Sequence, residues 1–331
     1  MKDIKLSPLF WPVQLKGKTI HILDETLLPQ KLKYIKATNH KQACRAISEM
    51  KTRAVGQVLL VLYIFLTVVR KNKKKAHEKM FPILREVAQI INTSRPTLSF
   101  SYLTDMVLGW FCAGEDLEKT ILGFLETLKA KRIQQAESTS QLINDGDVIL
   151  THCNVSGLIP LIGEFCRKQN KKVSFFVTET RPYLKGSRLS AWELEKGGFD
   201  TTVIADNMVA QVMCEGKINK VIVGADNLAQ NGDIANKVGT YQIAILAKHF
   251  SIPFYVLCPP ASQAKTGKDI KIEIRPEKEL LEYQGLRLAA KGVKGYYPAF
   301  DITPHELVSA IITDKGIIRP PYEKNILKVL K

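Results

Sequence analysis

The residues best suited to chemistry follow runs of apolar, β-branched sequence. Cys153 comes directly after VILTH, and Asp226 comes directly after VIVGA. A thiolate is a strong nucleophile and a carboxyl group can act as a general acid or base. The apolar run before Asp226 predicts a carboxyl whose pKa is raised by desolvation or lowered by a nearby cation. Cys153 is expected between a strand and a helix, where backbone N–H groups favour a thiolate, although a small buried hydrophobe is the alternative.

A candidate phosphate site lies shortly after Asp226. Asp233 is the expected N-cap of a helix whose first turn holds Asn236 and Lys237, and apolar residues recur at three- and four-residue steps from Val238. Free N–H groups at a helix start and an ammonium group together suit a phosphate. The chain contains neither GxGxxG nor GxxxxGK[ST], so the usual modes of dinucleotide and nucleoside-triphosphate binding lose support.

Two arginines are candidates for binding the same anion. Arg53 precedes a bend of small residues and Arg95 precedes a proline. A guanidinium group suits bidentate capture of phosphate. A surface or salt-bridge role is the alternative for each.

The elements that must position these residues change character along the chain. Residues 1–139 are expected to form a mostly helical N-terminal domain with short strands near its start. Residues 140–331 alternate β-rich runs with helical segments, which predicts βαβ units and a parallel sheet. We therefore expect an α/β protein whose second domain is a Rossmann-like, doubly wound sheet with its ligand at the carboxyl ends of the strands.

Composition limits the class of protein. The 331 residues carry a formal net charge of +16, which suits an anionic partner. The basic clusters have no interleaved aromatic residues, so nucleic acid is not the expected partner. The apolar run 54–69 contains Gln57 and is shorter than the ~20 residues needed to cross a bilayer, so a buried helix or a subunit-contact helix is expected instead. Six scattered cysteines without a CxxC pair favour a reducing cytoplasm.

Several longer stretches resemble one known family. ILTHCN, ETRPYLKGSRLSAWEL, GADNLAQNGDIANKVGTYQIAILAKHFSIPFYV and PAFDITP are similar to the S-methyl-5-thioribose-1-phosphate isomerases of methionine salvage. These enzymes share a superfamily with ribose-1,5-bisphosphate isomerases and with the regulatory subunits of translation initiation factor 2B. The resemblance extends over nearly the whole chain, because LDETLLP also matches an N-terminal motif of the family.

The resemblance implies an aldose–ketose isomerase that needs no metal or organic cofactor and forms a homodimer. It makes Cys153 the residue that stabilises the transition state and Asp226 the acid or base. It implies substrate contacts, chiefly to phosphate and sugar hydroxyls, from six residues: Arg53, Ala54, Arg95, Lys185, Asn236 and Lys237. A dimer would also give the apolar run 54–69 a partner.

Three departures from the family pattern concern the substrate. Residues 53–57 read RAVGQ where the family typically has RGAPA, Lys185 stands where the family has glutamine, and the loop after Asn154 is shorter. An extra ammonium group suits a second phosphate better than a thiomethyl group. Ribose 1,5-bisphosphate or another 5-substituted ribose 1-phosphate is therefore the alternative substrate. A non-catalytic regulatory subunit is the alternative of another class, although such relatives generally lack the cysteine and aspartate pair.

Overall fold

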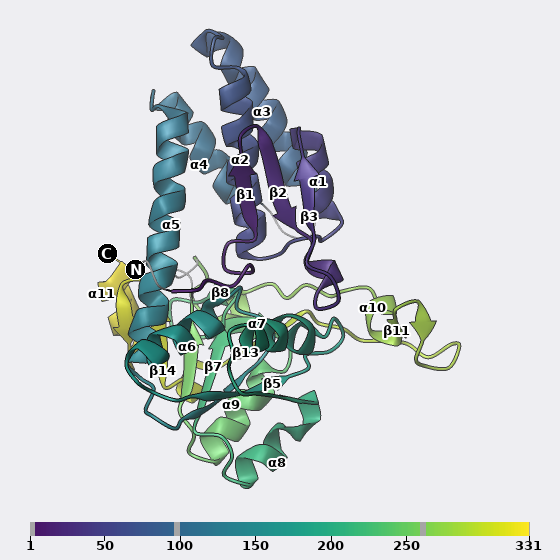
Figure 1. Cartoon of the computed structure of the whole chain (residues 1–331), viewed down its shortest axis with the longest axis vertical. Coiled ribbons are helices and arrows are strands. Elements are labelled where there is room, and N and C mark those ends of the chain that lie inside the picture. Colours follow the sequence, from purple (N-terminus) through teal and green to yellow (C-terminus); the bar gives the residue numbers. More distant parts are fainter. Residues whose placement is uncertain (1–3, 96–99, 259–262, 331) are drawn as a thin grey trace. The chain divides into compact units, whose positions relative to one another are not determined.

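The computed structural model describes residues 4–95, 100–258 and 263–330 (Figure 1). These residues form two units, which are described in turn. One unit is Pro8–Ala130, and the other combines residues 4–7 with those from Lys131 onward.

The first unit is mostly helical, as expected. A three-stranded antiparallel sheet in the order β1-β2-β3 lies beside its helices. The strands are β1 (Val13–Lys16), β2 (Thr19–Leu23) and β3 (Tyr34–Ala37), and the 3-10 helix η1 (Glu25–Leu27) follows β2. The helices are α1 (His40–Ser48), α2 (Val55–Lys71), α3 (His77–Thr93), α4 (Ser101–Cys112) and the first half of α5 (Leu117–Ser140).

The apolar run 54–69 forms helix α2, the centre of this unit's core. Its side chains pack against the small sheet and against α1, α3 and α4. Gln57 is only 1 % exposed, and its amide oxygen accepts a hydrogen bond from Arg95 at 2.9 Å. The expectation of a buried helix is confirmed. The dimer contact expected for this run stays a prediction.

The second unit is built on a seven-stranded sheet in the order β15-β14-β10-β7-β4-β5-β6. Six strands are parallel and the edge strand β15 is antiparallel to β14. The strands are β4 (Val148–Thr151), β5 (Ser174–Thr178), β6 (Thr201–Ile204), β7 (Lys220–Gly224), β10 (Phe254–Leu257), β14 (Ala310–Thr313) and β15 (Gly316–Ile318). The order reverses between β4 and β7, so the expected doubly wound sheet is confirmed, with its switch point between these two strands.

Helices cover both faces of this sheet (Figure 1). They are α6 (Leu158–Lys168), the π-helix η2 (Gly186–Ser190), α7 (Ala191–Lys196), η3 (Asp206–Met208), α8 (Val209–Cys214), α9 (Thr240–His249), η4 (Gly267–Asp269), η5 (His305–Leu307) and α11 (Tyr322–Leu330). Apolar side chains of α8, α9 and α11 form one core with the strands. Burial of such parallel strands on both faces explains why they read as continuous apolar runs.

Two smaller sheets are added to this unit. Strands β8 (Asn227–Leu228), β9 (Ile234–Lys237) and β13 (Phe300–Thr303) form an antiparallel sheet beyond the end of β7. Helix α10 (Lys278–Leu281) and the hairpin of β11 (Glu282–Tyr283) and β12 (Leu286–Arg287) form an arm that projects from the unit (Figure 1).

The division between the units falls inside α5, at residues 130 and 131, whereas the sequence placed it after residue 139. Contacts made by the last turns of α5 explain why the division lies nearer the N-terminus than expected. Lys131 forms an ion pair with Asp314 at 3.0 Å, and the Gln135 amide donates to the carbonyl oxygens of Cys258 and Ile312. The last turns of α5 therefore belong to the sheet.

No helix within residues 4–95, 100–258 and 263–330 is both long enough and apolar enough to cross a membrane.

Candidate functional site

Cys153 lies in a tightly held turn after strand β4. Its backbone has φ +64, an uncommon value for a residue with a Cβ, and its side chain is buried. The N–H of Cys153 donates to Oγ1 of Thr180 at 2.9 Å, and its carbonyl accepts from the Ser190 hydroxyl at 2.6 Å. Helix α6 begins only at Leu158, so the thiol does not lie in the first turn of that helix. Hydrogen bonds to neighbouring loops, rather than a helix dipole, fix this turn.

Thr180 belongs to the loop after the adjacent strand β5. It also has positive φ, +62, which is costly for a β-branched residue. The carboxylate of Asp206, which follows β6, offsets that cost by accepting from the N–H groups of Thr180 and Arg181, each at 2.7 Å. Strained backbone of this kind is concentrated at functional sites. The ends of β4, β5 and β6 are therefore joined by hydrogen bonds around Cys153.

Asp226 follows β7, the strand that pairs with β4 at the switch point. Its N–H donates to the Ala235 carbonyl at 2.9 Å, which starts the pairing of β8 with β9. Burial raises the pKa of the Cys258 thiol and the charge of Asp226 adds to the rise, so the Asp226 carboxylate lies near the end of β10. The side chain is exposed. The exposure argues against the desolvated carboxyl that was one expectation, since β7 ends at Gly224 and Asp226 lies beyond it, and the alternative of a nearby cation stays a prediction.

The loops that carry Cys153 and Asp226 contact one another. A Cβ placed on Gly224 would lie 3.1 Å from Cγ1 of Val155, so the turn after β4 packs directly on the end of β7. The two residues thus follow neighbouring strands on the same edge of the sheet, where strands are about 4.8 Å apart.

Asn236 and Lys237 are not in a helix, so that expectation is wrong. They belong to strand β9, which pairs antiparallel with β13, opposite Asp301 and Phe300. Helix α9 begins at Thr240 after Gly239, which has φ +106. The pairing overrides the local helical pattern, because it satisfies the backbone of β9 with a strand more than sixty residues later in the chain.

Asp233 is correspondingly not a helix cap. Its Oδ1 accepts from the backbone and ring nitrogens of His305, and its Oδ2 accepts from the amide of Asn231 and the N–H of Gly267. These four bonds fasten three loops together, and the hydrogen bonds lower the pKa of Asp233 against the opposing effect of its burial.

Both lysines of the candidate site border one gap between side chains, which is too small to hold a water molecule. Its walls are Thr180, Arg181, Tyr183, Lys185, Lys237 and Tyr297. The Lys237 ammonium is buried, donates to the Ala299 carbonyl at 2.6 Å, and lies 4.8 Å from the centre of the Phe300 ring. Burial raises the pKa of the Tyr297 hydroxyl, and Thr180 of the same gap accepts from the N–H of Cys153. The structure therefore brings Lys185, Lys237 and Cys153 to the same region of the sheet unit.

The remaining candidates, Arg53, Ala54 and Arg95, lie together in the helical unit. Ala54 has φ +44 and directly precedes α2, and the hydrogen bond between Arg95 and Gln57 ties Arg95 to the first turn of that helix. The buried carboxylate of Glu25 accepts from the Thr52 hydroxyl at 2.6 Å and from the Arg53 N–H at 3.1 Å. Arg53 and Ala54 thus directly precede this 17-residue helix, and binding of an anion there stays a prediction.

Known proteins resemble the chain over nearly its whole length. The model of the initiation factor 2 subunit family matches residues 54–320. The chain belongs to this family. The methylthioribose-1-phosphate isomerase of Fervidobacterium nodosum is 37 % identical over 95 % of the chain and 96 % of its own length. That of Petrotoga mobilis is 36 % identical over 99 % of the chain and 100 % of its own length.

Solved structures of family members have the same fold. The 5-methylthioribose 1-phosphate isomerase of Pyrococcus horikoshii superposes with a TM-score of 0.89 at 29 % identity, covering 99 % of both chains. Subunit delta of translation initiation factor eIF-2B from A. fulgidus gives a TM-score of 0.84 at 33 % identity, covering 98 % of this chain and 99 % of its own. The matches confirm the expected enzyme class, an aldose–ketose isomerase, and support a role in methionine salvage.

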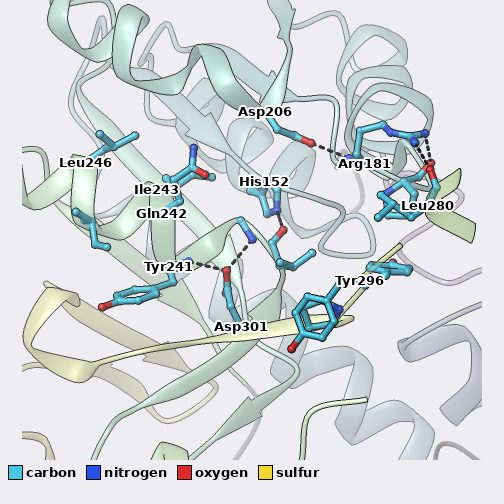
Figure 2. A pocket seen from close by; sticks show the side chains of 16 residues that line it. His152, Arg181, Asp206, Tyr241, Gln242, Ile243, Leu246, Leu280, Tyr296 and Asp301 are labelled. Carbon is cyan, nitrogen blue, oxygen red and sulfur yellow. Dashed lines mark hydrogen bonds between the residues drawn. The ribbon is translucent and has the colours of Figure 1, made fainter. Parts of the chain in front are cut away.

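A larger cavity of about 560 Å³ lies next to the gap that Lys185 and Lys237 border, and Arg181 and Tyr297 line both (Figure 2). His152, Asp206 and Asp301 contribute to it, together with apolar residues of α9 and of the segment around Tyr296. Neither Cys153, Asp226 nor the two lysines line it. Its size suits a small molecule, but its rim is apolar and exposed at Tyr241, Ile245 and Tyr296, which is more typical of a protein contact.

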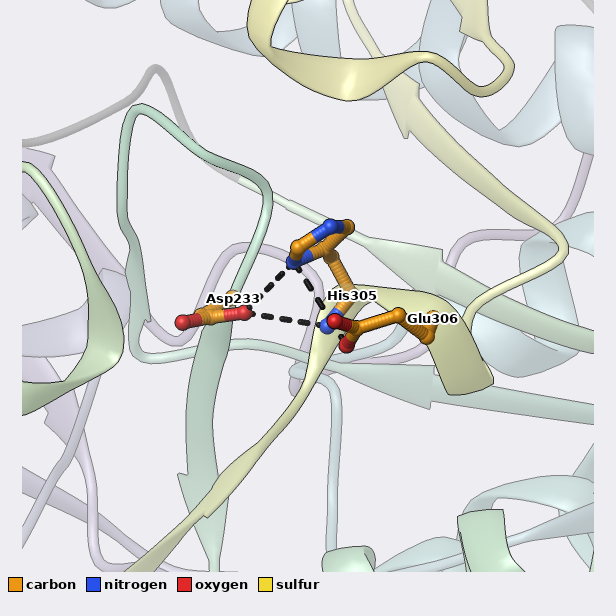
Figure 3. A group of neighbouring side chains, drawn as sticks. All are labelled: Asp233, His305 and Glu306. Atoms are coloured by element: carbon orange, nitrogen blue, oxygen red, sulfur yellow. Dashed lines mark hydrogen bonds and ion pairs between the residues drawn. The ribbon is translucent and has the colours of Figure 1, made fainter.

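Figure 3 shows Asp233, His305 and Glu306, whose ligand atoms lie within 4.8 Å of one another. Both carboxylate oxygens of Asp233 already accept two hydrogen bonds each, and the Glu306 side chain is 68 % exposed. The cluster therefore fits a structural junction of three loops better than a metal centre.

Sequence reasoning gave no role to three residues that shape the site. His152 directly precedes the candidate Cys153, and that neighbour is the only signal for it in the sequence. Tyr297 and Asp301 come from the segment that pairs with β9, more than sixty residues after it. No local pattern relates these segments, so only the tertiary pairing identifies them.

Proposed function

We propose that the chain converts 5-methylthioribose 1-phosphate into 5-methylthioribulose 1-phosphate. The observation that carries this proposal is the position of Cys153 and Asp226 after β4 and β7, the two strands that flank the switch point of the sheet. Ligands of doubly wound sheets bind at this point. The names of the relatives support the choice of sugar.

The chemistry begins at the ring oxygen of the sugar. The phosphate on the anomeric oxygen blocks ordinary ring opening, so an acid must protonate the ring oxygen as the bond from C1 to that oxygen breaks. The hydrogen on C2 then moves to C1, either as hydride or through an enediolate, and the C2 hydroxyl loses its proton to become the ketone. One proton is donated and one is recovered, so a single acid and base at Asp226 balances the reaction.

Asp226 is exposed in the free chain, so substrate must cover it for its carboxyl to act in a water-poor site. Cys153 is already buried and held by two backbone hydrogen bonds. A fixed thiol beside C1 and C2 stabilises the transition state without reorganisation.

Binding of the phosphate falls to cations. We assign it to Lys237 of strand β9, with the amide of its neighbour Asn236 as a further donor. Charge-assisted hydrogen bonds are about twice as strong as neutral ones, which suits an affinity that depends on the phosphate.

Ribose 1,5-bisphosphate is the second candidate substrate. Lys185 and Lys237 border the same gap, and a second ammonium group favours a second phosphate. A panel of ribose 1-phosphates with thiomethyl, hydroxyl or phosphate at C5, followed by ¹³C NMR for a new C2 carbonyl, separates the candidates. The proposal expects the highest kcat/KM for the thiomethyl sugar, and preference for the bisphosphate would overturn it.

We also propose that the chain forms a homodimer, as its resemblance to the family implies. Tyr241, Ile245 and Tyr296 expose apolar area around the larger cavity and provide a surface for a second copy. Sedimentation at twice the chain mass of 37.2 kDa is expected, with dissociation in Ile245→Glu. A monomeric wild-type protein would contradict this proposal.

The proposed location is the cytoplasm. All six cysteines are free in the structure, which fits a reducing compartment. Fractionation of cells followed by immunoblotting checks this expectation.

A further inference from the structure

His152 connects two loops of the proposed site. The side chain is 2 % exposed, with Nδ1 2.6 Å from Oγ1 of Thr178 and Nε2 3.0 Å from the carbonyl oxygen of Val238. A carbonyl oxygen can only accept, so Nε2 carries the ring proton and Nδ1 accepts from the Thr178 hydroxyl. The surroundings thus define one tautomer of the imidazole.

On one side, the imidazole is linked to Cys153. The hydroxyl of Thr180 lies 3.2 Å from that of Thr178 and accepts from the N–H of Cys153 at 2.9 Å. Because Thr178 donates to the ring, its hydroxyl oxygen can accept from Thr180, whose hydroxyl also donates to the Thr178 carbonyl oxygen at 3.2 Å. Hydrogen bonds therefore connect the Cys153 amide with the Val238 carbonyl through Thr180, Thr178 and His152.

On the other side, the imidazole is linked to Lys237. Val238 directly follows Lys237, and Gly239 packs so closely on the ring that an added Cβ would lie 3.0 Å from its Cε1. The Lys237 ammonium is itself anchored to the Ala299 carbonyl. The backbone of residues 237–239 can therefore approach Cys153 only as far as the imidazole allows.

We propose that His152 is a positioning residue, which sets the place of Lys237 relative to Cys153 through its two ring nitrogens. This inference rests on the proposed isomerase function of the same site. His152 does not touch the reacting atoms itself. Its effect passes through Cys153 on one side and through the phosphate-binding segment on the other.

Two variants separate the two sides. His152→Asn keeps an acceptor at the place of Nδ1 and loses the bond to Val238, so the segment of Lys237 is released and KM should rise more than kcat falls. His152→Gln keeps a donor at the place of Nε2 and loses the bond to Thr178, so the Cys153 turn loosens and kcat should fall more than KM rises. Loss of a hydrogen bond that positions a residue of the site is expected to lower kcat/KM about 10- to 100-fold.

Asp147→Asn is the matched control. Asp147 lies one residue before β4, at the opposite end of the strand from His152, and forms a buried ion pair with Lys220 at 3.2 Å. Its loss destabilises the same sheet without touching either loop of the site. We expect it to lower the unfolding midpoint while leaving KM and kcat of the folded protein near wild type.

A chemical readout tests the inference independently of catalysis. In a background with Cys112 and Cys214 replaced by serine, the rate of iodoacetamide alkylation at Cys153 is followed by mass spectrometry. His152→Gln should change this rate about tenfold, and Asp147→Asn should not. If wild-type protein shows no isomerase activity, the proposed function fails and the alkylation rates alone decide for or against His152. Rates and kinetic constants within about twofold of wild type in both His152 variants, or equal losses in Asp147→Asn, would overturn the inference.

Discussion

The carboxylate of Asp301 accepts a hydrogen bond from the backbone N–H of Gly239 at 2.7 Å and a second from Tyr241 at 3.2 Å. It therefore caps helix α9 from the neighbouring strand β13 (Figure 2). The cap fixes the turn between Lys237 and the helix, on which the phosphate-binding role of this segment depends.

Asp301 should make stability depend on pH in a defined window. Burial raises the pKa of Asp301 from 3.8 to about 6, against the opposing hydrogen bonds and the charge of Lys237. Below pH 3.8 the carboxyl is protonated in both states. As the pH rises towards 6, the unfolded chain ionises first, so the folded state loses stability.

Asp301→Asn keeps an acceptor oxygen but cannot ionise. The free energy of unfolding of wild type minus that of the variant should therefore fall between pH 4 and pH 6 and stay level above it. Urea unfolding at five pH values measures this difference. A difference that grows as the pH rises would contradict the burial argument.

Gly239 should resist substitution for two reasons. Its φ of +106 disfavours any residue with a Cβ, and that Cβ would press on the His152 ring. Gly239→Ala should lower stability by about 1–3 kcal/mol beyond the backbone cost and should lower kcat/KM. Gly292→Ala is the control, since Gly292 has φ +93 and no atom within 4 Å of the added Cβ. Equal losses in the two variants, measured by urea unfolding, would argue against the contact with His152.

Lys237 should govern affinity for the phosphate. Lys237→Met keeps the aliphatic stem and removes the ammonium, so KM should rise about 10- to 100-fold, as expected for a lost hydrogen bond to a charged group. Steady-state kinetics with the thiomethyl sugar phosphate measures the change. Lys220→Met is the control, because Lys220 is equally buried but lies at the start of β7, far along the strand from the site. A KM that rises equally in both variants would mean that the effect is one of stability.

Lys185 should distinguish the two candidate substrates. Lys185→Gln removes the second ammonium group from the gap that it borders together with Lys237. We expect kcat/KM for the thiomethyl sugar to change less than about threefold, and that for ribose 1,5-bisphosphate to fall about tenfold or more. Competition between the two sugars in one reaction gives the ratio directly. Losses of equal size with the two sugars would mean that Lys185 does not recognise the substituent at C5.

Much of the sheet could be predicted from the sequence, because its strands are buried on both faces and read as short apolar runs at regular spacing. The same runs placed Cys153 and Asp226 at strand ends. Residues 234–237 could not be predicted, because their helical pattern is overridden by pairing with β13. The exposure of Asp226 could not be predicted either. The end of β7 at Gly224 depends on its hydrogen bonds to the neighbouring strands, which the apolar run does not reveal.

The role of His152 was also beyond the sequence. A lone histidine beside a cysteine gives no indication of what its two nitrogens bond to. Thr178 and Val238 lie 26 and 86 residues away along the chain. The hydrogen bonds between His152 and these two residues form only because the order of the strands brings the three residues together.

The most direct test of the account compares Cys153→Ser with Cys166→Ser in the conversion of 5-methylthioribose 1-phosphate, followed by ¹³C NMR at C2. Cys166 is buried in helix α6 of the same unit, and burial raises the pKa of its thiol to about 11, so its replacement controls for loss of a buried thiol. We predict that Cys153→Ser stays folded by circular dichroism and forms ketose at least about 100-fold more slowly than wild type, while Cys166→Ser stays close to wild type. Ketose formation at the wild-type rate by folded Cys153→Ser would contradict the account.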